Sequence, residues 1–157
     1  MLHILAAFIF FTRLPFWRLA EVPSEYFKNV VSRWALVGWL TAGLSVIVLY
    51  TASLILPASV AVLLAIVTRL LITGCLHEDG LADFFDGFGG GTSRERILSI
   101  MNDSHIGSYG VIGLILYFAL LYTLLSSLPL TLAGSAILAG DPFSKGVAGM
   151  IINRLPY

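Results

Sequence analysis

Long apolar runs constrain the fold of this chain more than any other feature. A helix that crosses a bilayer needs about 20 mostly apolar residues. Four runs approach that length: residues 35–56, 58–76, 111–128 and 131–152. Pro57 separates the first two, and a helix accepts proline in its first turn, so they are predicted to form a tight helical hairpin. The fourth run is the weakest candidate, because it carries Asp141, Pro142 and Lys145 in its middle.

The composition agrees with a membrane location. Hydrophobic residues make up 58% of the chain, charged residues only 11%, and the mean hydropathy is +0.93. Because soluble domains average roughly 25% charged residues, we expect an integral membrane protein in contact with lipid. The expected fold class is all-α: a polytopic helical membrane protein with about four transmembrane helices, plus interfacial amphipathic helices.

Charge and cysteine content exclude some partners and leave others open. The formal net charge is zero and no stripe of lysine and arginine is present, so nucleic acid is not an expected partner. The single cysteine, Cys75, has no partner for an internal disulfide, and its place in an apolar run predicts a buried thiol. No repeat or low-complexity linker divides the chain, so one helical domain over residues 1–157 is predicted. A homo-oligomer is left open.

Positive charges predict the orientation, since lysine and arginine are retained in cytoplasmic loops. They flank one set of span ends and are absent around Pro57 and Pro129. The lysines and arginines that flank these ends are Arg13, Arg18, Lys28, Arg33, Arg94, Arg96 and Arg154. Both ends of the chain and the segment 77–110 are therefore predicted to face the cytoplasm.

Carboxylates are concentrated in "HEDGLADFFDG", directly after the second apolar run. Asp79, Asp83 and Asp86 stand at i, i+4 and i+7, which places all three on one face of a helix. Such carboxylates repel one another unless a cation neutralises them, and oxygen ligands suit Mg²⁺ or Mn²⁺ together with substrate phosphates. We therefore predict a metal site at Asp79, Asp83 and Asp86, with Asp83 or Asp86 also acting as a catalytic base. The alternative is a solvated helix end whose acids only favour the interface.

The residues after the acids predict an anion-binding segment. "GFGGG", residues 87–91, is predicted to form a mobile turn that lets backbone N–H groups approach a phosphate. Thr92 as N-cap and Glu95 at the third helical position then form a capping box. Arg94 and Arg96 near this helix start are candidate anion ligands. The alternative is an amphipathic helix that lies on the membrane surface.

The segment "NDSHIGSYG" supplies Asp103, Ser104 and His105 in a turn-rich return to the third apolar run. Turn chemistry alone explains Asn102 and Asp103. By themselves these residues therefore carry modest functional weight.

The motifs together resemble one protein family, cobalamin 5′-phosphate synthase (adenosylcobinamide-GDP ribazoletransferase). The resemblance rests on "FFTRLP", "HEDGLADFFDG", "SRERILSIMNDSHIGSYG" and the closing "FSKGVAGMIINRLPY", in this order. It implies a Mg²⁺-dependent enzyme of the bacterial or archaeal cell (inner) membrane. The implied reaction joins adenosylcobinamide-phosphate, from adenosylcobinamide-GDP, to α-ribazole or its 5′-phosphate and releases GMP. It also assigns nucleotide binding to Arg94, Arg96, Asp103, Ser104 and His105.

The chain differs from this family in length, and two other functions compete with the resemblance. Family members are longer, so the C-terminal third is expected to be missing and the chain to be a fragment or to hold an incomplete site. A lipid enzyme like the CDP-alcohol phosphotransferases is disfavoured because Asp83 stands where that signature has arginine. A divalent-cation transporter is disfavoured because the outer connections carry no acidic ring.

Overall fold

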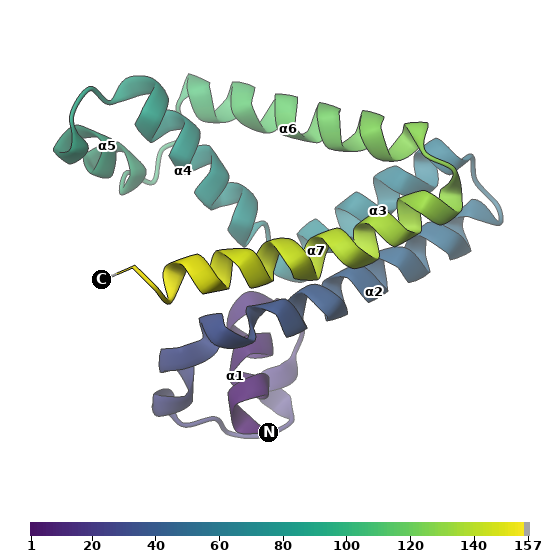
Figure 1. Cartoon of the computed structure of the whole chain (residues 1–157), viewed down its shortest axis with the longest axis horizontal. Coiled ribbons are helices and arrows are strands. Elements are labelled where there is room, and N and C mark those ends of the chain that lie inside the picture. The colour runs from purple at the N-terminus through teal and green to yellow at the C-terminus, as the bar shows by residue number, and fades with distance from the viewer. Residues whose placement is uncertain (156–157) are drawn as a thin grey trace. The chain divides into compact units, whose positions relative to one another are not determined.

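The computed structural model describes residues 1–155, which form helices and connecting segments and contain no strand. The all-α prediction is thereby confirmed. The helices are α1 (Leu2–Phe11), η1 (Phe16–Arg18), η2 (Ser24–Arg33), α2 (Trp34–Ser53), α3 (Ala58–Thr73), α4 (Leu76–Gly90), α5 (Arg94–Met101), α6 (Ser108–Ser127) and α7 (Leu130–Ile152) (Figure 1).

The chain divides into two compact units. One comprises Met1–Gly74 and the chain from Leu125 onward, and the other is Cys75–Leu124. The predicted site segment 77–110 lies entirely in the second unit. The expectation of one domain over residues 1–157 stays a prediction.

Two helical stretches within residues 1–155 are long and apolar enough to cross a membrane by themselves: Ser24–Ser53 and Ser108–Ser127. A third candidate arises only when α3 and α4 are taken together across the break between them. Of the four predicted spans, the first and third are thus long and apolar enough by themselves to cross a membrane. The protein is a helical membrane protein with two such helices, or up to three if the broken pair is one span.

The break between α3 and α4 lies at Gly74 and Cys75, two consecutive residues in the left-handed region, with φ of 64° and 60°. The predicted span 58–76 therefore ends at Thr73. Gly74 is the C-cap, where a left-handed glycine is common, and its N–H donates to the Leu70 carbonyl. Cys75 is exposed, so the prediction of a buried thiol is wrong: the helix ends before the cysteine, which starts a new one.

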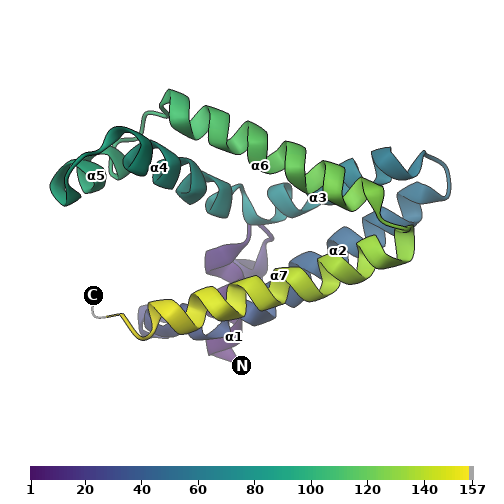
Figure 2. The same ribbon diagram turned by 45° about the horizontal axis from the view of Figure 1, so that its top comes forward.

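Helices α2 and α7 lie side by side in both views (Figure 2). A Cβ on Gly38 would come within 2.5 Å of the Pro142 Cα, so the absence of a side chain there permits the close approach. The fourth predicted run forms a continuous helix of 23 residues despite Pro142. By length and apolar character, α7 is not among the helices that could cross a membrane by themselves.

A polar cluster lies inside the α2–α7 contact. Lys145 and Asp141 form an i,i+4 ion pair with side chains only 4% and 8% exposed. The buried Thr41 hydroxyl of α2 donates to Asp141 Oδ2. The charges that weaken the α7 apolar run thus neutralise each other within the helix pair.

The N-terminal segment packs on the start of α2. Ala6, Ala7 and Phe11 of α1 are buried with Val30 and Val37. The ring of Phe11 stacks on Trp34 with 5.0 Å between centroids. This packing holds α1 against η2 and α2.

Candidate active site

Helix α4 carries the predicted acidic face. It runs without interruption over Leu76–Gly90, so Asp79, Asp83 and Asp86 do share one side of a helix. Their exposure decreases along the helix: Asp79 is exposed, Asp83 is half-buried and Asp86 is only 7% exposed. The three carboxylates are therefore not equivalent.

Asp86 is engaged by the start of α6. Its Oδ2 accepts a hydrogen bond from the Gly107 N–H at 2.7 Å, and its Oδ1 accepts one from the Gly110 N–H at 2.8 Å. Helix starts leave such N–H groups without intrahelical partners, and a carboxylate suits the positive end of the helix dipole. A Cβ on Gly107 would lie 2.5 Å from Asp86 Oδ1, so the contact also requires glycine. Asp86 thus joins α4 to α6.

Sequence reasoning missed this role of Asp86. The partners of its carboxylate lie 21 and 24 residues further along the chain. The usual N-cap signal is a side chain immediately before the helix. The glycines of "HIGSYG" were the available hint, since each leaves room for an approaching acceptor.

The electrostatics single out Asp83. Partial burial raises the pKa of this carboxyl above its ordinary value, and the charges of Asp79 and Asp86 raise it further. Each of these causes disfavours the ionised form. A cation beside Asp83 would relieve the repulsion.

The oxygen donors of α4 suit a hard divalent cation only in part. Within residues 1–155 no group of three or more histidine, cysteine, aspartate or glutamate side chains is arranged to hold a metal ion. Asp79 and Asp83 stand one turn apart, where Cβ atoms are separated by about 5–6 Å. Mg²⁺ commonly takes one or two carboxylates and leaves its other positions to water and phosphate. Asp79 and Asp83 fit that chemistry, whereas both oxygens of Asp86 already accept hydrogen bonds.

The glycine-rich segment is helical, so the prediction of a mobile turn over residues 87–91 is wrong. Helix α4 continues to Gly90. A Cβ on Gly87 would lie 2.6 Å from the Met101 side chain, and one on Gly89 would lie 2.5 Å from the Tyr109 ring. The glycines therefore serve close packing of α4 against its neighbours, and this packing outweighs the low helix propensity of glycine.

Helix α5 begins one residue later than predicted. Its N-cap is Ser93 in place of Thr92, and the Ser93 hydroxyl accepts a hydrogen bond from the Arg96 N–H at 3.2 Å. Both residue types cap helices well, so sequence alone does not separate them. The shift moves Glu95 to the second helical position and removes the predicted capping box.

The first turn of α5 carries the predicted arginines. Arg94 and Arg96 are both exposed. Ile97 and Met101 lie against Gly87 of α4, and α4 and α5 are neighbours in the fold (Figure 1). Part of the apolar side of α5 is therefore covered by protein. The arginine guanidinium groups remain open to an anion, as the sequence predicts.

The loop between α5 and α6 brings Asp103 and His105 together. Asp103 Oδ1 lies 2.6 Å from His105 Nδ1 and also accepts the His105 backbone N–H at 3.1 Å. These hydrogen bonds are the largest causes that lower the pKa of the Asp103 carboxyl below its ordinary value. Ser104, between the two, is exposed.

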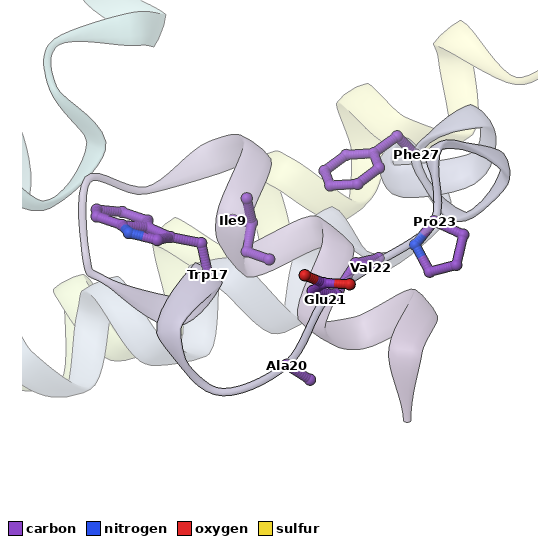
Figure 3. A pocket seen from close by; sticks show the side chains of 7 residues that line it. All are labelled: Ile9, Trp17, Ala20, Glu21, Val22, Pro23 and Phe27. Carbon is purple, nitrogen blue, oxygen red and sulfur yellow. The ribbon is translucent and has the colours of Figure 1, made fainter.

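A groove of about 600 Å³ lies elsewhere, in the N-terminal part of the first unit. Figure 3 shows the side chains that line it, among them the Glu21 carboxylate and the rings of Trp17 and Phe27. The other lining residues are Ile9, Ala20, Val22 and Pro23. A mostly apolar groove with one carboxylate offers no cation for a phosphate, so the acidic face of α4 is the better candidate for phosphate chemistry.

Comparison with known proteins identifies the family of the chain. The family model for cobalamin-5-phosphate synthase matches residues 3–157. The chain belongs to the cobalamin-5-phosphate synthase family. The match to this family covers the acidic face, the arginines of α5 and the Asp103–His105 loop together.

Relatives in the same family come from Shewanella. A protein of Shewanella sp. strain W3-18-1 named adenosylcobinamide-GDP ribazoletransferase is 46% identical over 156 residues, which is 98% of this chain and 60% of the relative. A protein of the same name from Shewanella oneidensis is 43% identical over 151 residues, 94% of this chain and 58% of the relative. The chain thus spans about three fifths of the length of these relatives. No solved structure matches it.

Proposed function

We propose that this protein transfers the adenosylcobinamide-phosphate group of adenosylcobinamide-GDP to α-ribazole or α-ribazole 5′-phosphate and releases GMP. The observation that carries the proposal is family membership over residues 3–157, together with 46% identity to a relative named for this transfer. The acidic face of α4 supports it, because phosphoryl transfer requires charge neutralisation around a diphosphate.

In this reaction a ribose hydroxyl of the acceptor attacks the phosphorus on the cobinamide side of the diphosphate. The bond from that phosphorus to the bridging oxygen breaks, and GMP leaves with this oxygen. The chain need form no covalent intermediate, so its contribution is positioning and electrostatics.

Asp79 and Asp83 are the residues that we assign to Mg²⁺. When bound, the ion would neutralise charge on the diphosphate and on the departing GMP. Asp83 suits this role because partial burial and the charges of Asp79 and Asp86 raise its pKa, and a bound cation would offset these effects. Asp86 has a different role, because its two accepted hydrogen bonds hold the start of α6 against α4.

Arg94 and Arg96 are assigned to the phosphate oxygens of the nucleotide. Both side chains are exposed at the first turn of α5. One guanidinium group donates two parallel hydrogen bonds to a phosphate, which orients the diphosphate as well as neutralising its charge. Ser104, exposed in the next loop, adds a hydroxyl donor to the same group of ligands.

We further propose that this site faces the cytoplasm at the inner membrane, where nucleotides are available. The support is the placement of lysine and arginine on one set of span ends. A reporter fused after Gly90 is expected to lie in the cytoplasm, and one fused at Pro57 outside it. The reverse pattern would refute this orientation.

The test of the reaction is direct. Purified full-length protein in detergent is incubated with adenosylcobinamide-GDP, α-ribazole and Mg²⁺, and GMP and cobalamin are quantified by chromatography. We expect both products in equal amounts and neither when Mg²⁺ is removed by a chelator. Release of GMP without cobalamin would indicate hydrolysis and contradict the proposal. Parallel reactions with a diacylglycerol acceptor test the related lipid chemistry.

The same assay measures what the described chain does by itself. We expect the 157-residue chain to bind Mg²⁺-nucleotide weakly and to form no measurable cobalamin, whereas a form extended to the length of the Shewanella relatives is active. Misplacement of reacting groups by about 1 Å costs on the order of 10²-fold, so turnover is more sensitive than binding to how closely the acceptor is held. Equal activity of the two forms would show that residues 1–157 hold the complete site.

A further inference from the structure

The Asp103–His105 pair has the arrangement of an oriented base. One oxygen, Asp103 Oδ1, lies 2.6 Å from the ring Nδ1 and 3.1 Å from the backbone nitrogen of His105. An ionised carboxylate only accepts hydrogen bonds, so Nδ1 carries a proton and its N–H donates a hydrogen bond to Asp103 Oδ1. In the neutral ring the other nitrogen, Nε2, then has its lone pair available.

The ring is also accessible. The His105 side chain is 89% exposed, so Nε2 is not enclosed by protein and a ligand can approach it. The Asp103 side chain is 57% exposed. An aspartate that holds the far nitrogen of a solvent-facing imidazole is the arrangement by which enzymes fix the tautomer of a general base.

The pair is tied to the acidic helix within one compact unit. Two residues after His105, the Gly107 N–H donates to Asp86 Oδ2 of α4. Two residues of extended chain span at most about 7 Å, so His105 is held within that reach of the contact between the loop and the acidic face. Residues 77–110 all belong to this unit.

The aspartates of α4 are poorly suited to be the base. Both oxygens of Asp86 accept backbone hydrogen bonds. Asp79 and Asp83 are assigned to the metal, and a carboxylate bound to a cation is a weaker base. The reaction nevertheless requires a group that accepts the proton of the attacking hydroxyl.

We propose that His105 is the general base of the transfer and that Asp103 is the positioning residue that orients its ring. This assignment rests on the proposed function. Nε2 takes the proton of the ribose hydroxyl while the oxygen–phosphorus bond forms and the bond to GMP breaks. The imidazolium is stabilised by Asp103 and afterwards returns its proton to water, to which the exposed ring has access.

The first experiment reads the tautomer without any assay of turnover. Residues 1–157 contain three histidines, His3, His77 and His105. Comparison with His105→Gln assigns the ring of His105 in the full-length protein labelled with ¹⁵N-histidine. We expect the neutral ring to carry its proton on Nδ1, and Asp103→Asn to shift the population toward the Nε2-protonated form. A neutral ring protonated on Nε2 in the wild type would overturn the proposal.

The second experiment measures turnover with adenosylcobinamide-GDP, α-ribazole and Mg²⁺. We expect His105→Ala to lower kcat by about 10²–10⁴-fold, the usual contribution of a general base, with little change in nucleotide binding. Added imidazole should restore turnover of His105→Ala in a saturable manner and leave the wild type unaffected, because the exposed position admits a small base. His3→Ala, which changes a histidine of the other unit, serves as the control and should retain full activity.

The outcomes separate the two proposals. If the wild type forms no cobalamin, the proposed function fails and the base role fails with it. If the wild type is active and His105→Ala keeps its turnover, only the base role fails. Loss of turnover that imidazole does not restore would also contradict the base role, since a purely structural histidine behaves in that way.

Discussion

Two parts of this molecule hold aspartates on helices and treat their charge in opposite ways. In the α2–α7 contact, Asp141 lies beside Lys145 and receives the Thr41 hydroxyl, so its charge is balanced within the protein. On α4, partial burial and the charges of Asp79 and Asp86 raise the pKa of Asp83. Balanced buried charge is typical of structural contacts, whereas charge left unbalanced invites a ligand. The difference separates the part that holds the fold from the part that we assign to chemistry.

The largest expected effect comes from breaking the balanced ion pair in the α2–α7 contact. Asp141→Leu leaves Lys145 buried without its carboxylate, and breaking a buried pair costs about 3–5 kcal/mol. We expect a loss of this size in the free energy of unfolding, measured with denaturant in detergent micelles. The double variant Asp141→Leu/Lys145→Met should recover most of the stability, because apolar side chains of similar volume replace the pair. A double variant as unstable as the single one would contradict this view.

The next largest expected effect tests the unbalanced carboxylates of α4. Asp83→Asn is expected to lower the rate of transfer by about 10²–10³-fold, as expected for loss of preorganised electrostatic stabilisation. Its thermal stability should equal or exceed that of the wild type, because a charge raised in energy by Asp79 and Asp86 is removed. Glu25→Gln, an exposed carboxylate of η2, is the matched control and should change neither quantity. A destabilised Asp83→Asn would place Asp83 with Asp141 as a structural residue.

Asp86 is intermediate between Asp141 and Asp83, because it lies on α4 but its carboxylate accepts two backbone hydrogen bonds. In Asp86→Asn the amide nitrogen must face one of the two backbone N–H donors, so one buried donor loses its acceptor. We expect a cost of about 1–3 kcal/mol in unfolding free energy. Hydrogen exchange of the Gly107 and Gly110 amides should increase in this variant. Unchanged exchange would show that Asp86 does not hold the start of α6.

The smallest expected effect is stabilisation by the ion itself. Mg²⁺ at ten times its dissociation constant should stabilise the wild type by about 1.4 kcal/mol, as mass action requires of a ligand that binds only the folded state. The gain should vanish in Asp83→Asn and persist in Asp141→Leu. Thermal unfolding with and without Mg²⁺ measures it. An equal gain in Asp83→Asn would place the ion elsewhere.

The sequence predicted the local features well because they depend on short spacings. The apolar runs predicted helices, and the i, i+4, i+7 spacing placed three aspartates on one side of α4. The start of α5 was missed by one residue, since Thr92 and Ser93 are both good caps. Residues 87–91 were predicted as a turn although 87–90 are helical, because propensity alone contains no information on the neighbours that make a glycine helix favourable.

The sequence by itself therefore determined the membrane environment, the all-helical class, the acidic face of α4 and, through its motifs, the family. The tertiary structure decided which charges are satisfied. Thr41 meets Asp141 across 100 residues, and Asp86 meets Gly107 across 21. The spacing of residues within one helix reports which side chains share a face, but it contains no information on what that face will contact. Only the packing of one helix against another distinguishes an aspartate that holds the fold from one that remains available to a ligand.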